Sequence, residues 1–125
     1  MEKRKILVVD DEVSLSRMVK LNLEATGRYE VLVENKGSLA LQAARKFKPN
    51  LILLDIVMPD LEGSEVAQQV KADPELKNTP IVFLTATVTT EEVGMSGGTI
   101  GGQPFLAKPV TAAQLVDCID KHVAK

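Results

Sequence analysis

The chain of 125 residues has little of several features that mark other classes of protein. It contains one cysteine, Cys118, so it can form no internal disulfide, which suits a reducing compartment. No apolar stretch approaches the roughly 18 residues that a membrane-spanning helix needs, and the N-terminus has no signal-peptide core. We therefore expect a cytoplasmic protein that makes no contact with a membrane.

An excess of charge of one sign is also absent. The formal net charge is -2, and the only basic cluster is the short run Lys3 to Lys5, so we expect no direct nucleic-acid partner. The chain has no Gly-x-x-x-x-Gly-Lys-Ser/Thr loop that would bind a nucleotide. The single histidine, His122, stands near the end of the chain. Any phosphoryl donor is therefore expected to be another molecule.

What the chain does have is a regular alternation of short apolar runs with helical patterns. This alternation predicts one α/β domain over residues 1–125, built on a parallel sheet. The predicted strands are 6–9, 29–33, 51–54, 81–84 and 105–107. A capping box at Thr111 and Gln114 predicts the start of the last helix. The helical faces are predicted from these residues: Leu15, Met18, Val19 and Leu23; Leu39, Ala43 and Phe47; Val66, Ala67 and Val70; Leu115, Ile119 and Val123.

The crossover between the last two predicted strands is rich in glycine. Five glycines lie in residues 94–102, and each costs a helix about 0.8 to 1 kcal/mol relative to alanine. We expect a frayed or short helix there. It can be a tolerated loop or a surface that becomes ordered on binding a partner.

Acidic residues stand where two of the apolar runs end. Asp10 and Asp11 follow the first run, and Asp55 follows the third. If the five strands take the doubly wound order 2-1-3-4-5, these acids meet in one crevice at the carboxyl ends of neighbouring strands. Three carboxylates this close repel one another, so they favour a divalent cation that prefers oxygen ligands, Mg²⁺ or alternatively Mn²⁺. Thr85 and Lys108 follow the last two strands and are expected at the same edge.

Each of these residues also has a purely structural interpretation. Asp10 and Asp11, with the following Glu12, could cap the first helix, and Asp55 could belong to a turn. Lys108 could be a surface lysine and Thr85 a loop hydroxyl. For Phe105, packing alone is an equally good interpretation.

Four segments together resemble the receiver domain of two-component response regulators, over nearly the whole chain. They are Val8-Val9-Asp10-Asp11-Glu12, the stretch from Leu54 to Gly63 (Leu-Asp-Ile-Val-Met-Pro-Asp-Leu-Glu-Gly), Leu84-Thr85-Ala86, and Phe105-Leu106-Ala107-Lys108-Pro109. The resemblance implies a flavodoxin-like (βα)5 fold. It also implies that a histidine kinase or a histidine phosphotransfer protein phosphorylates Asp55, and that an unidentified protein receives the signal downstream.

The resemblance also implies roles for the other residues. Magnesium would be held by Asp11, Asp55 and the backbone carbonyl of Val57, with Asp10 assisting through water. Lys108 would contact the phosphoryl group, Thr85 and Phe105 would be switch residues, and the peptide bond between Lys108 and Pro109 would be cis.

The sequence therefore predicts a Mg²⁺-dependent switch that accepts a phosphoryl group and loses it slowly, rather than a metabolic enzyme. Two other functions remain open. One is an interaction module that no longer uses phosphorylation. The other is a phosphatase with an aspartyl nucleophile, although such enzymes usually carry a second aspartate where this chain has Val57.

Overall fold

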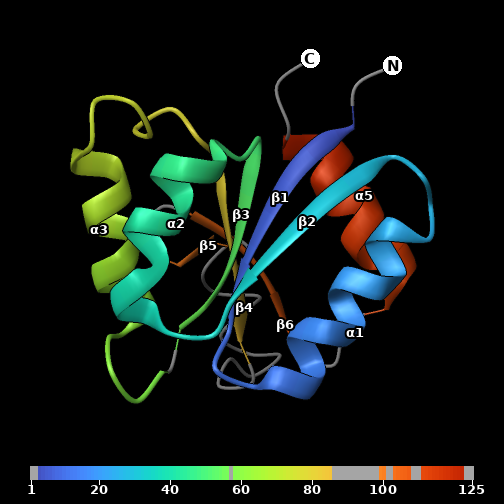
Figure 1. Ribbon diagram of the computed structural model, residues 1–125, viewed down its shortest axis with the longest axis horizontal. Helices are drawn as coiled ribbons and strands as arrows, with labels where there is room; N and C mark the ends of the chain where they lie inside the picture. Colours follow the sequence, from blue (N-terminus) through green and yellow to red (C-terminus); the bar gives the residue numbers. More distant parts are fainter. Residues whose placement is uncertain (1–2, 57, 86–98, 101–102, 108–110, 123–125) are drawn as a thin grey trace.

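A six-stranded sheet lies at the centre of the computed structural model, which describes residues 3–56, 58–85, 99–100, 103–107 and 111–122 (Figure 1). The strand order in this part of the chain is β2-β1-β3-β4-β6-β5. The predicted order of five parallel strands is therefore confirmed, with β6 as the fifth. The short β5 pairs antiparallel with β6 and was not predicted. The bounds are β1 (Arg4–Val9), β2 (Tyr29–Glu34), β3 (Leu51–Asp55), β4 (Ile81–Thr85), β5 (Thr99–Ile100) and β6 (Gln103–Ala107).

Helices cover both faces of this sheet. On one side lie α2 (Ala40–Phe47) and α3 (Gly63–Ala72), and on the other lie α1 (Val13–Glu24) and α5 (Ala112–His122) (Figure 1). A 3-10 turn, η1 (Gly37–Leu39), precedes α2. Most of the glycine-rich segment 94–102 lies outside the described residues, but Thr99–Ile100 form a strand rather than a helix. Among the described residues, no helix is long and apolar enough to span a membrane.

The strands β1 and β3 are apolar on both faces because helices cover both. Ile6 and Val8 of β1 belong to the core shared with α1 and α5, whereas Leu7 and Val9 belong to the core shared with α2 and α3. All four side chains are 0% exposed. The continuous apolar runs of β1 and β3 are thus explained by burial on both sides, as expected of a parallel sheet.

Two helical faces differ from those predicted. Met18 is 47% exposed, and Ser16 is buried in its place alongside Val19 and Leu23. Leu39 is 41% exposed because α2 begins one residue later and buries Ala40 instead. In both helices the apolar spacing fits two neighbouring faces, and packing against the sheet decides between them.

One local prediction is confirmed, and two further residues fit the positions that they occupy. The amide of Gln114 donates to the Thr111 hydroxyl oxygen (3.1 Å) and the amide of Thr111 donates to the Gln114 side chain (2.9 Å), which forms the predicted capping box. Gly27 follows α1 with a left-handed φ of 77°, a conformation that glycine adopts without a steric penalty. Cys118 is buried in the core.

Candidate functional site

Asp55 is the last residue of β3 and follows four buried aliphatic residues. Its side chain lies at the carboxyl edge of the sheet, and the residue is only 5% exposed. The start of α3 approaches this position closely, since the amide of Gly63 donates to the carbonyl oxygen of Ile56 (2.7 Å). Asp55 is therefore buried where the end of β3 meets the start of α3.

Asp10 and Asp11 follow the neighbouring strand β1. Asp10 is fully buried, and its Oδ1 accepts a hydrogen bond from the amide of Glu12 (2.9 Å). The backbone of Asp10 continues the pairing with β2, because its amide donates to the carbonyl oxygen of Glu34 (3.1 Å). Asp11 is partly exposed. One buried and one accessible carboxylate therefore stand side by side at the end of β1.

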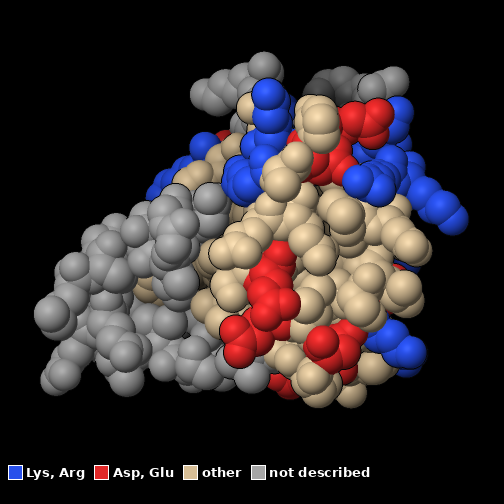
Figure 2. All heavy atoms as spheres, turned by 90° about the vertical axis from the view of Figure 1, so that its left-hand side faces the viewer, with Lys and Arg blue, Asp and Glu red and all other residues tan. Residues whose placement is uncertain are grey.

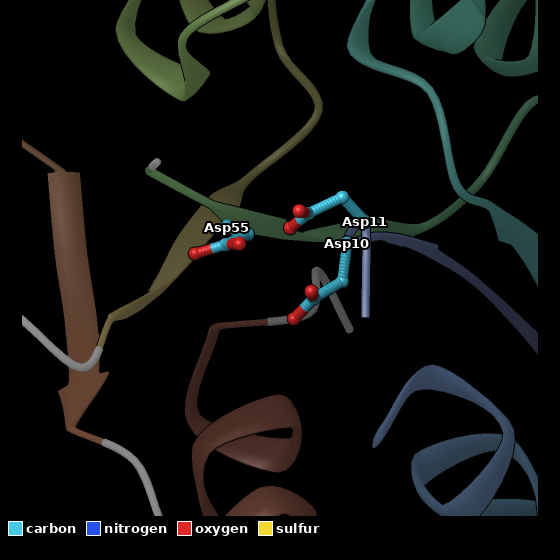
Figure 3. A group of neighbouring side chains, drawn as sticks. All are labelled: Asp10, Asp11 and Asp55. Atoms are coloured by element: carbon cyan, nitrogen blue, oxygen red, sulfur yellow. The ribbon is translucent and has the colours of Figure 1, made fainter. Parts of the chain in front are cut away.

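The structure brings the three acids together, as the strand order predicts. One carboxylate oxygen from each of Asp10, Asp11 and Asp55 lies within 4.8 Å of the others. The three side chains converge on a common space between the ends of β1 and β3 (Figure 3). A set of three carboxylates supplies only oxygen ligands, which suits a hard divalent cation such as Mg²⁺ or Mn²⁺ and does not suit a soft metal.

Helix capping does not account for these acids. The residue before α1 is Glu12, whose side chain makes no capping hydrogen bond, and the first turn of α1 contains no acidic residue. The bond from the Glu12 amide to Asp10 closes a local turn ahead of the helix. This local bond involves only Oδ1 of Asp10. It does not explain why Asp10 lies close to Asp11 and Asp55.

The remaining predicted residues are placed only in part. β4 ends at Thr85, which stands in register with Ala107 of β6, so Thr85 reaches the same edge of the sheet as Asp55. Phe105 is partly buried, stands in register with Phe83, and packs on the core shared with α2 and α3. Val57, Lys108 and Pro109 lie outside the described residues.

Sequence reasoning missed two polar residues that connect the loops around the acids. Asn35 follows β2, and its Nδ2 donates to the carbonyl oxygen of Asp10 (2.7 Å). Asp60, in the loop between β3 and α3, accepts hydrogen bonds from the amides of Gly37 (3.2 Å) and Ser38 (3.0 Å). Hydrogen bonds from Ser38 are the largest cause holding the pKa of Asp60 below its usual value. Asn35 could have been found as another polar residue at a strand end, whereas nothing in the sequence pairs Asp60 with residues 37–38.

Charge is unevenly distributed over the face formed by α2 and α3. Most acidic side chains visible there lie in the lower half, and basic ones gather mainly at the top, where the parallel strands begin (Figure 2). Arg45 and Lys46 in the last turn of α2, and Lys71 in that of α3, contribute to the basic end. Cations there complement the helix dipoles. The carboxyl edge that carries the three aspartates is consequently the acidic end of this face.

Known proteins match this chain in sequence and in fold. Residues 6–120 match the model of the response regulator receiver domain. The chain is 36% identical over 114 residues to the DNA-binding response regulator MtrA of Mycobacterium tuberculosis, covering 91% of this chain and 48% of that protein. It is 37% identical over 114 residues to the probable transcriptional regulator ycf27 of Pyropia yezoensis, covering 91% of this chain and 45% of that protein. It thus spans about half the length of these curated relatives.

A solved structure agrees over its full length. The chemotaxis protein CheY4 of Vibrio cholerae superimposes with a TM-score of 0.84 at 31% identity, and the match covers 98% of this chain and 100% of that one. The strand order, the acids at the ends of β1 and β3, and the match over residues 6–120 lead to one conclusion. The chain belongs to the family of response regulator receiver domains of two-component signalling.

Proposed function

We propose that Asp55 is the phosphoacceptor of this domain and that the acid cluster holds Mg²⁺, with Mn²⁺ as an alternative. The observation that carries the proposal is the meeting of three carboxylate oxygens within 4.8 Å at the carboxyl edge of the sheet. In this arrangement Asp11 and Asp55 are the side-chain ligands, and the buried Asp10 acts through water. Val57 would add its carbonyl oxygen. When bound, the cation neutralises charge on the transferring phosphoryl oxygens.

The reaction follows from the chemistry of a carboxylate nucleophile. A carboxylate oxygen of Asp55 forms a bond to the phosphorus of a phosphohistidine. The phosphorus–nitrogen bond breaks, and the imidazole nitrogen keeps the electron pair and takes up a proton. Lys108 supplies a positive charge to the phosphoryl group. Thr85 and Phe105 are the proposed switch residues, which change position when the acyl phosphate forms.

The partners follow from the same chemistry. The donor is a histidine kinase or a histidine phosphotransfer protein in the cytoplasm, since this chain has no nucleotide-binding loop of its own. The output is contact with a downstream protein. The described surface near the acids is negatively charged, so we propose no direct contact of this domain with nucleic acid or with a membrane. Turnover is limited to self-phosphorylation from a donor and slow self-dephosphorylation.

Incubation with acetyl phosphate and Mg²⁺, followed by intact-mass measurement, tests the proposal. The parent chain should gain the mass of one phosphoryl group, and Asp55→Asn should gain none because an amide is a poor nucleophile. Asp117→Asn is the matched control, since Asp117 is a highly exposed aspartate on α5 that does not belong to the group of three acids. Equal labelling of Asp55→Asn and the parent would overturn the assignment. A parent that is never labelled would favour an interaction module without phosphorylation.

A further inference from the structure

The segment 35–38, which runs from the end of β2 into η1, is hydrogen-bonded to the loop that carries Asp10 and Asp11. Both hydrogens of the Asn35 amide are used there: Nδ2 donates to the carbonyl oxygen of Asp10 (2.7 Å) and to Oγ of Ser16 (3.0 Å). Ser16 is 1% exposed, and its own hydroxyl donates to the carbonyl oxygen of Val13 (3.0 Å). Asn35 therefore ties the end of β1 to the first turns of α1.

The same segment is attached to the loop that follows Asp55. The carboxylate of Asp60 accepts hydrogen bonds from two consecutive amides, those of Gly37 and Ser38. Gly37 lets the two loops approach closely: a Cβ there would lie 2.8 Å from the carbonyl oxygen of Leu61 and 3.1 Å from its Cβ. Segment 35–38 thus contacts the loop that carries Asp10 and Asp11 as well as the loop that follows Asp55.

We propose that segment 35–38 sets the spacing between Asp10–Asp11 and Asp55, and that Asn35 is a positioning residue for the cation site. This inference rests on the proposed function. The carbonyl group of Asp10 belongs to the same planar peptide unit as the amide of Asp11. A hydrogen bond to that carbonyl therefore fixes the plane from which the side chain of Asp11 extends. Hydrogen bonds that orient ligands in this way typically change metal affinity 10- to 100-fold when removed.

A purely structural role for Asn35 predicts a different result. If Asn35 only stabilised the end of β2, its removal would lower the resistance of the cation-free protein to unfolding and leave the metal site unchanged. Asn50 offers the matched comparison. Its Oδ1 accepts a hydrogen bond from the amide of Lys5 (2.7 Å), so it too binds the backbone of β1, but at the end opposite the acids.

The test measures Mn²⁺ affinity from the electron paramagnetic resonance signal of free Mn²⁺, with thermal unfolding of the cation-free protein alongside. Asn35→Ala should raise the dissociation constant about tenfold. Asn50→Ala should leave it within about twofold of the parent, since distant sites act independently. Asp60→Ala should change affinity in the same direction as Asn35→Ala. If the Mn²⁺ dissociation constant of Asn35→Ala lies within about twofold of the parent value, the proposal is overturned.

A second measurement separates positioning from general damage. In the acetyl phosphate reaction, Asn35→Ala should need about tenfold more Mg²⁺ for half-maximal rate, yet reach nearly the parent rate when Mg²⁺ is saturating. A lower maximal rate with unchanged Mg²⁺ dependence would contradict the inference. If Asn35→Ala does not fold, Ser16→Ala takes its place, because it removes one of the two acceptors of Asn35. The Mn²⁺ affinity of Ser16→Ala must then be lower than that of Asn50→Ala.

The outcomes also distinguish this inference from the function on which it rests. If the parent binds Mn²⁺ and becomes phosphorylated while Asn35→Ala binds equally well, only the positioning role fails. If the parent neither binds the cation nor becomes labelled, the proposed function fails and the positioning role fails with it.

Discussion

The carbonyl oxygen of Asp55 lies where a side chain on Gly63 would begin. A Cβ at Gly63 would sit well inside van der Waals contact with that oxygen and only 2.8 Å from Cα of Ile56. Both neighbours are backbone atoms and cannot rotate away. The start of α3 can therefore pack against the phosphoacceptor strand only if residue 63 has no side chain.

Gly63→Ala should destabilise the fold because of this contact. We expect a loss of about 1–3 kcal/mol in the free energy of unfolding, measured by urea denaturation. Gly27→Ala is the comparison: nothing lies within 4 Å of its Cβ, but its φ is 77°, so we expect a loss of about 1–2 kcal/mol from backbone strain alone. Asn tolerates that conformation, so Gly27→Asn should recover part of the loss. Gly63→Asn should recover none, and recovery there would refute the steric explanation.

Replacement of Asp11 should weaken the cation site without unfolding the protein. Asp11 is partly exposed and is one of the three clustered carboxylates. Asp11→Asn removes a charge but keeps the shape, and we expect Mg²⁺ affinity to fall on the order of tenfold or more in a calorimetric titration. Cys118→Ser, on α5 in the core, should keep the parent affinity in the folded protein. Comparable losses in both variants would mean that the cation binds elsewhere.

The ion pair between Arg45 and Asp73 should give stability that depends on pH. Nε of Arg45 lies 2.6 Å from Oδ2 of Asp73, whose side chain is 4% exposed. This hydrogen bond is the main cause that lowers the pKa of Asp73 below its usual value. A lowered folded-state pKa stabilises the protein above the unfolded-state pKa of about 3.9, and this stability is lost as pH falls through the folded value.

Asp73→Asn should therefore be less stable than the parent at neutral pH, and the two should converge below about pH 4. The measurement is the urea midpoint over a series of pH values. Asp117 pairs with Lys121 on the surface of α5, where both side chains are about 70% exposed. Asp117→Asn should have almost the same urea midpoint as the parent at every pH. If the difference in urea midpoint between Asp73→Asn and the parent stays the same in acid, the charge of Asp73 is not the cause of that difference.

Lys48 should be replaceable by glycine with a gain in stability. It follows α2 with a left-handed φ of 54°, and its amide donates to the carbonyl oxygen of Ala44 (2.8 Å). Glycine is the usual residue at this position after a helix, because a Cβ in the left-handed region costs about 1–2 kcal/mol. Part of that gain is lost to the greater freedom of glycine in the unfolded chain, so we expect Lys48→Gly to add about 0.5–1 kcal/mol in thermal denaturation.

Lys46→Gly serves as the opposite control for Lys48→Gly. Lys46 has helical conformation in the last turn of α2, where glycine should cost up to about 1 kcal/mol. A destabilised Lys48→Gly variant would show that the lysine side chain contributes more than the backbone strain costs.

The sequence by itself determined the five parallel strands and the identity of the clustered acids. The runs ending at Val9 and Leu54 are apolar at every position because both faces of the sheet are covered, and this signal is local and strong. An acid directly after such a run has few structural explanations, so Asp10, Asp11 and Asp55 stood out. The capping box at Thr111 and Gln114 could also be predicted from the sequence, because its two partners are only three residues apart.

Only the tertiary structure decided which helical faces are buried and which loops are joined. The spacing of Leu15, Met18 and Val19 fits more than one rotation of α1, and packing on the sheet buries Ser16 and exposes Met18. Asn35 and Asp60 form hydrogen bonds with backbone groups up to 25 positions away, so no local pattern predicts those bonds. Hydrophobic periodicity specifies an element and roughly its face. The bonds that position the acids depend on how the finished elements meet at the edge of the sheet.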